Sequence, residues 1–175
     1  MGNNLTDTII SQTEKALWEV KNVIDCVPEE LWDKCYCEMP MWQHIYHTLH
    51  SLDLWYINPN DKNYAEPSIH RKNLNNLDIK PDDGIRLSRV DINNYYDDIK
   101  IKIDKYLSEI SDNSLLEKPA DCVYDRFTLI LAQIRHLHTH MGMIMGFIID
   151  DTGLWPRVLG LRGEIPLNEN YDKYF

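Results

Sequence analysis

Apolar side chains recur at every third or fourth position in four long segments of the chain, and this spacing limits the possible folds more than any other sequence feature. Such a period places the apolar residues on one face of an α-helix. The four segments are residues 6–27, 40–57, 88–110 and 124–149. Pro28 and Pro59 follow the first two segments, where helices should end because proline is rarely tolerated inside a helix. We therefore predict four long helices.

The connections between these helices indicate how they pack. A polar stretch, about residues 58–83, separates the second helix from the third and is long enough to cross a bundle. A length of 175 residues suits one domain with one core. We therefore expect an all-α four-helix bundle that spans residues 1–175 as a single domain. The tail, about residues 150–175, should be irregular, with Trp155 and Leu159 as its anchors.

The charge and the termini exclude several classes of protein. The formal net charge is −10, which argues against non-specific nucleic-acid binding, because that needs clustered lysine and arginine. We find no secretory signal, and no apolar run approaches the roughly 18 residues of a membrane helix. We therefore expect a cytoplasmic protein that binds neither nucleic acid nor membrane. Its thiols should be reduced, and Cys35 and Cys37 are closer in sequence than the usual zinc-binding pair.

The histidines of the fourth helix are the first candidates for a functional site. His136 and His140 are four residues apart, so they project from one helix face, one turn apart. Two imidazoles in that arrangement can bind one metal ion, as in the zinc motif His-Glu-x-x-His. His138 lies about 200° round the helix from His136 and should stay outside such a site. The neighbouring residues are largely apolar, which predicts that the pair is buried.

The second helix offers three further histidines, His44, His47 and His50. The main apolar stripe of this helix favours His50 as the inward-facing residue, because His47 lies nearly opposite that stripe. The other side is also partly apolar, as Leu54 shows, and such a helix can be buried on both sides. The pattern therefore leaves the choice between His47 and His50 open, with His44 the weakest candidate.

Taken together, the two histidine-bearing helices resemble those of the DinB-like (DinB/YfiT) superfamily. In the second helix the matching residues are Trp42, Tyr46, His47, Thr48, Leu49 and Asp53. In the fourth helix they are Arg135, His136, His140 and Gly142. The resemblance covers most of the chain in layout and about thirty residues in motif.

The resemblance implies an up-down-down-up bundle, often a homodimer, that holds a divalent metal ion, typically zinc or nickel. Carried over position by position, the implied metal ligands are His47, His136 and His140. His50 stands where that version of the family usually has an aromatic or aliphatic residue. This departure leaves His50 as a rival ligand, a partner of a ligand or a proton carrier.

The resemblance also implies a class of function. Characterised relatives include S-transferases and isomerases that use low-molecular-weight thiols. We therefore expect a metal-dependent transferase or hydrolase, in which the ion activates a thiol or water to attack a small electrophilic substrate. The alternative is a non-catalytic metal-binding or stress-related bundle protein. Because ligating imidazoles usually donate their second N–H to an acceptor, Asp53, Gln133 and Tyr46 are candidate partners of the ligands.

Overall fold

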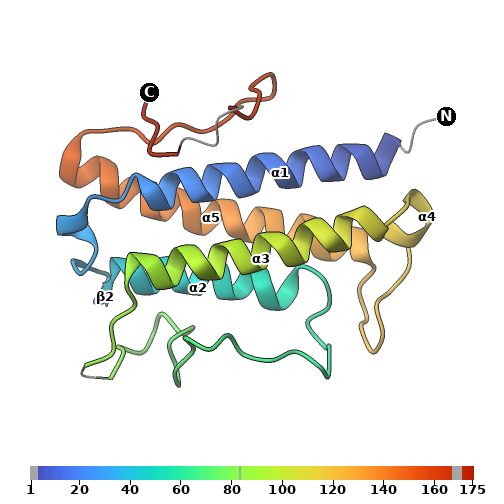
Figure 1. Ribbon diagram of the computed structural model, residues 1–175, viewed down its shortest axis with the longest axis horizontal. Helices are drawn as coiled ribbons and strands as arrows, with labels where there is room; N and C mark the ends of the chain where they lie inside the picture. Colours follow the sequence, from blue (N-terminus) through green and yellow to red (C-terminus); the bar gives the residue numbers. More distant parts are fainter. Residues whose placement is uncertain (1–3, 83, 167–170) are drawn as a thin grey trace.

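The computed structural model describes residues 4–82, 84–166 and 171–175. Four long helices dominate it (Figure 1): α1 (Asn4–Asp25), α2 (Met41–Trp55), α3 (Arg89–Glu109) and α5 (Arg126–Thr152). The prediction of a mostly helical chain, with four major helices and a long loop between the second and the third, is confirmed. The predicted helix ends differ from the observed ends by a few residues. In Figure 1, α1 and α5 run towards one end of the bundle and α2 and α3 towards the other.

Four short elements were not predicted from the sequence: η1 (Glu29–Leu31), β1 (Cys35–Tyr36), β2 (Met39–Pro40) and α4 (Asp112–Leu115). The two strands form an antiparallel hairpin that leads directly into α2. Its turn residues, Cys37 and Glu38, have φ angles of 48° and 72°. Positive φ at both turn positions is the geometry of a type I′ hairpin turn, which usually contains asparagine and glycine. The hairpin escaped prediction because its residues lack that signal.

The ends of α3 and α5 follow from local sequence. Ser88 caps α3, and its reciprocal hydrogen bonds with Asp91 form the capping box that the sequence contains. Asp125 caps α5 by accepting a hydrogen bond from the backbone N–H of Thr128. At the other end of α5, Gly153 adopts a left-handed conformation with φ of 72°, which glycine tolerates without steric cost. Asp125 and Gly153 therefore define the two ends of α5, the helix that carries His136 and His140.

Helix α2 is enclosed on almost every side. It packs against α3 and α5, and buried residues occur all round it, including Trp42, His44, Thr48 and His50. This burial explains why hydrophobic periodicity alone does not identify its inward face. The three tryptophans Trp18, Trp32 and Trp42 are all buried.

The long loop between α2 and α3 closes the open side of α2. In Figure 1 it returns along the bundle from the end of α2 to the start of α3. Leu74 is fully buried and joins the hydrophobic core, and the Gln43 amide donates to the backbone carbonyls of Asn76 and Ile79. The loop contains no helix among its described residues, and Asp83, where we expected it to end, lies outside them. These attachments place loop residues 66–75 beside His47 and His50 of α2.

The tail after α5 is irregular, as predicted. Of its two predicted anchors, Leu159 contacts α1, because its backbone N–H donates to the Glu19 carboxylate at 2.5 Å, whereas Trp155 does not serve as one. Trp155 is 58% exposed and therefore cannot anchor the tail by burial. Backbone contacts hold the tail instead: the Asn22 amide donates to the carbonyls of Arg157 and Lys173, and the Tyr174 hydroxyl donates to the Cys26 carbonyl. Residues 167–170 of the predicted tail lie outside the described residues.

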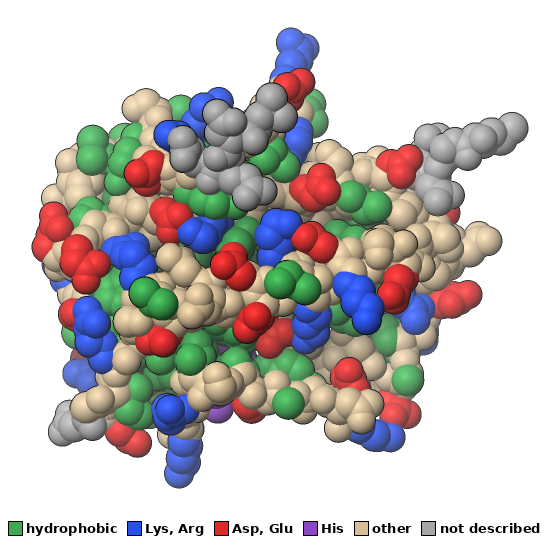
Figure 2. Space-filling model, viewed as in Figure 1, with side chains coloured by type: hydrophobic (Ala, Val, Ile, Leu, Met, Phe, Trp, Pro, Cys, Tyr) green, Lys and Arg blue, Asp and Glu red, His purple; other side chains and the backbone are tan. Residues whose placement is uncertain are grey.

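One face of the molecule carries charges of both signs. Acidic and basic side chains are interspersed over the face shown in Figure 2. Among the helices of the described residues, each is too short or too polar to cross a membrane. This agrees with the sequence, in which we found no membrane-spanning segment.

Candidate metal centre

Three imidazoles, one from α2 and two from α5, converge at the interface between these helices. The Nε2 atom of His140 lies 3.3 Å from Nε2 of His47 and 3.1 Å from Nε2 of His136. The three candidate ligand atoms all lie within 4.8 Å of one another. Two imidazoles bound to tetrahedral zinc through bonds of about 2.0–2.1 Å have nitrogens about 3.3–3.4 Å apart. The two pairs that include His140 therefore lie close to the spacing that one metal ion requires.

The orientation of His47 is fixed by the long loop. Its Nδ1 atom lies 2.6 Å from the backbone carbonyl of Asn75. A carbonyl only accepts hydrogen bonds, so Nδ1 of His47 carries the proton and Nε2 carries a free lone pair. A histidine that donates one N–H to a backbone carbonyl and offers its other nitrogen to an ion is the usual arrangement of a metal ligand.

Burial favours the neutral form of the three imidazoles. Loss of hydration lowers the pKa of His47 and of His136 below the ordinary value for histidine. For His140 the same loss, with the neighbouring His47 and His136, lowers the pKa to about 4. These shifts favour the neutral imidazole in all three side chains, which is the form that binds metals.

The three neutral imidazoles of the triad cannot all be paired with one another by hydrogen bonds between their Nε2 atoms. A neutral imidazole has one N–H. If the proton of His140 is on Nε2, only one of His47 and His136 can accept it in a well-aligned hydrogen bond, and the other loses this partner. If it is on Nδ1, the Nε2 lone pair of His140 faces the lone pair of His47. A cation between the three nitrogens removes this conflict, so the donor set fits a divalent ion.

The acceptors that we expected for the ligands are engaged elsewhere or unpaired. The Asp53 carboxylate accepts from the hydroxyls of Tyr64 and Tyr95 at 3.2 and 3.1 Å and from Lys102 at 2.5 Å. Tyr46 pairs with His70. Gln133 is buried, and its side-chain oxygen has no hydrogen-bond partner among the described residues. The sequence did not indicate the acceptor that holds His47, because that acceptor is a backbone carbonyl of the loop.

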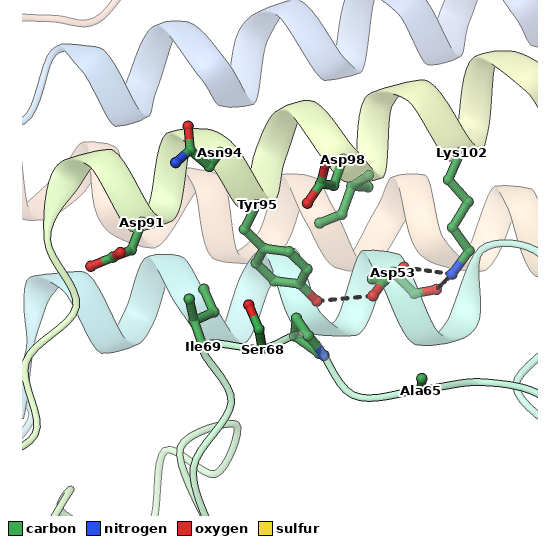
Figure 3. Close-up of a pocket in the computed structure, with 11 residues that line it drawn as sticks. Asp53, Ala65, Ser68, Ile69, Asp91, Asn94, Tyr95, Asp98 and Lys102 are labelled. Carbon is green, nitrogen blue, oxygen red and sulfur yellow. Dashed lines mark hydrogen bonds and ion pairs between the residues drawn. The ribbon is translucent and has the colours of Figure 1, made fainter.

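A polar pocket of about 410 Å³ lies between α3 and the loop (Figure 3). The Asp53 carboxylate extends from α2 into this region, where the Tyr95 hydroxyl and the Lys102 ammonium bind it. Loop residues 65 and 67–69 complete the lining. The Asp53 network therefore belongs to this pocket, on the α3 side of α2, whereas the triad lies between α2 and α5.

Two other histidines of α2 and α5, His44 and His138, lie outside the triad. His138 is exposed, and its Nε2 lies 3.1 Å from the Glu19 carboxylate, which raises the pKa of His138. The helical angle predicted this outward position. His44 is buried, and its Nε2 lies 2.8 Å from the Tyr36 carbonyl of the hairpin. Neither imidazole belongs to the triad.

His50, the rival of His47, faces the loop. It is buried, and its Nε2 lies 2.7 Å from the Glu66 carboxylate. His70 lies beside it, with a separation of 5.3 Å between the ring centroids. We missed both Glu66 and His70 in the sequence, because they stand alone in a polar loop without a motif. The structure therefore brings His47 to His136 and His140, and brings His50 to a different group.

The chain has no significant match among protein-family models, curated proteins or solved structures. The geometry establishes a helical bundle with histidine clusters that could hold a metal ion. The DinB-like assignment stays a prediction.

Proposed function

We propose that His47, His136 and His140 hold one divalent metal ion, as the DinB-like resemblance implies. The observation that carries this proposal is the convergence of three Nε2 atoms, with separations of 3.1 and 3.3 Å from His140, in a partly buried setting that favours their neutral form. The helix directions in Figure 1 are those of the up-down-down-up order of that family, which further supports the assignment. Imidazole suits zinc, nickel, copper and iron, and the resemblance favours zinc or nickel.

Three protein ligands leave room on the ion for an exogenous thiol or water. When bound, a divalent ion lowers the pKa of a thiol or water and so supplies a nucleophile at neutral pH. The triad contributes no negative charge, since all three of its members are neutral imidazoles. It is also only partly buried, so a small molecule can approach it. These features suit a site that takes an exogenous ligand beside the three histidines.

We infer a metal-dependent transferase that joins a low-molecular-weight thiol to a small electrophile, or a hydrolase that uses water in the same position. The residues of the chain would bind and orient the ion: Asn75 holds the ring of His47, and the rigid turn of α5 spaces His136 from His140. A protein that binds the metal without catalysis remains the second candidate, because nothing in the triad selects a particular substrate.

An assay with low-molecular-weight thiols and a chromogenic electrophile separates these two candidates. We expect saturable turnover in the zinc- or nickel-loaded protein, and loss of that turnover in His140→Ala. The matched control is His138→Ala, which changes a histidine of the same helix that lies outside the triad and should retain activity. Loaded protein that is silent with every thiol, and with water alone, would favour the non-catalytic alternative.

A further inference from the structure

A second cluster of metal-binding side chains lies on the loop-facing side of α2. It comprises His50 from α2 and Glu66 and His70 from the long loop. One ligand atom from each of the three lies within 4.8 Å of the others. We propose that this cluster is a second divalent-metal site, which shares no ligand with the His47, His136 and His140 triad.

Small side-chain shifts would bring the members of the cluster to the spacing that one ion requires. The Glu66 carboxylate oxygen Oε2 lies 2.7 Å from Nε2 of His50 and 3.7 Å from Nδ1 of His70. These values lie on either side of the spacing of about 3.3–3.4 Å expected between two ligands of tetrahedral zinc. Two histidines with one carboxylate are also an established ligand set, found at catalytic zinc and at non-haem iron sites.

The three side chains of the cluster range from buried to exposed. The side chain of His50 is 3% exposed, that of His70 is 19% exposed and that of Glu66 is 47% exposed. Loop residues on both sides of Glu66 line the pocket of Figure 3. An ion and a small ligand can therefore reach the cluster from solvent, while the deeper imidazole is held in place by the core.

Tyr46 completes the surroundings of the cluster. Its hydroxyl lies 2.7 Å from Nδ1 of His70, so an ion bound at that nitrogen replaces this hydrogen bond. Burial raises the pKa of Tyr46 well above its usual range, so the hydroxyl stays neutral and adds no charge to the site. Tyr46 therefore holds His70 only in the absence of an ion and is not one of the three ligands.

The two sites should differ in the metals that they accept. The triad of imidazoles carries no charge, whereas the carboxylate of Glu66 adds one negative charge and a hard oxygen donor. Oxygen donors suit Mn²⁺, while imidazole suits zinc, nickel and copper. We therefore assign the second site to divalent first-row ions including Mn²⁺, and the triad to zinc or nickel.

The simplest competing account is that Glu66 and His50 form an ion pair that fastens the loop to α2. Glu66→Gln distinguishes the two accounts, because an amide can still hydrogen-bond to His50 but is a poor metal ligand. Tyr46→Phe is the matched control, since it removes a hydrogen bond from His70 and leaves all three ligands.

Metal titrations of the full chain test the proposal. We expect wild type and Tyr46→Phe to bind two zinc ions per chain, and Glu66→Gln to bind one. Mn²⁺ binding, followed by loss of the free-ion electron paramagnetic resonance signal, should persist in His140→Ala and weaken by at least about tenfold in Glu66→Gln, since even loss of a residue that only supports a ligand costs about 10–100-fold. Equal zinc content and equal Mn²⁺ affinity in wild type and Glu66→Gln would overturn the second site. The triad proposal would survive that result, because its zinc ion depends on His140 and not on Glu66.

Discussion

Replacing His140 with alanine should lower the affinity of the triad for zinc by more than about 100-fold, because loss of a ligand should exceed the 10–100-fold effect of losing a residue that supports one. His140 is the middle member of the triad, and its Nε2 lies within 3.3 Å of both other nitrogens. The variant should fold, since removal of a partly buried imidazole also removes the conflict between lone pairs. Competition of zinc with a chromogenic chelator measures the change.

His138→Ala controls for the loss of a histidine from α5. His138 lies two residues from His140 but binds Glu19, so its replacement should leave the zinc affinity unchanged. It should cost about 1–3 kcal/mol of stability, because the buried Glu19 carboxylate loses one hydrogen-bond partner. An equal loss of zinc affinity in both variants would show that the effect comes from α5 as a whole and would contradict the assignment of ligands.

Replacing Trp32 with alanine should lower the free energy of unfolding by about 3–5 kcal/mol, as is typical of a buried large-to-small change. Trp32 is fully buried, its indole N–H donates to the Leu87 carbonyl at 2.9 Å, and the Arg89 guanidinium lies 4.3 Å from its ring centroid. The substitution leaves a cavity and an unpaired carbonyl where the hairpin, the loop and α3 meet. For a chain of this size the melting temperature should fall by roughly 6–20 °C.

Trp155→Ala is the matched control for that substitution. Trp155 is 58% exposed, so its removal should change the free energy of unfolding by no more than about 0.5 kcal/mol, as for most surface positions. Denaturant unfolding of the metal-free variants separates the two effects from any change in metal binding. Similar stabilities for both tryptophan variants would contradict the packing described around Trp32.

The four long helices could be predicted because their apolar period is repeated over many turns, which makes the apolar face of each helix clear in the sequence. The spacing of His136 and His140 likewise predicted that they share a face, since a helix fixes that geometry locally. The choice of His47 as a ligand could not be predicted from periodicity in the same way. Helix α2 is covered by α3, α5 and the loop, so both of its sides are apolar, and only the resemblance favoured His47 over His50.

The residues that the loop supplies could not be predicted. Asn75 contacts His47 through its backbone carbonyl, an atom that every residue has, so no side-chain pattern marks it. Glu66 and His70 meet His50 only because Leu74 and Gln43 fasten the loop along α2. Such contacts depend on the path of the whole loop and have no local period.

Zinc-edge X-ray absorption of the Glu66→Gln variant, loaded with one equivalent of zinc, tests the assignment of the triad most directly. The variant lacks a ligand of the second cluster, so the ion should occupy the triad. We predict a shell of nitrogen and oxygen atoms at about 2.0–2.1 Å, with the scattering pattern of three imidazoles and no sulfur. A sulfur shell at about 2.3 Å, which the exposed thiols of Cys35 and Cys37 would supply, or a shell with fewer than three imidazoles, would contradict the account.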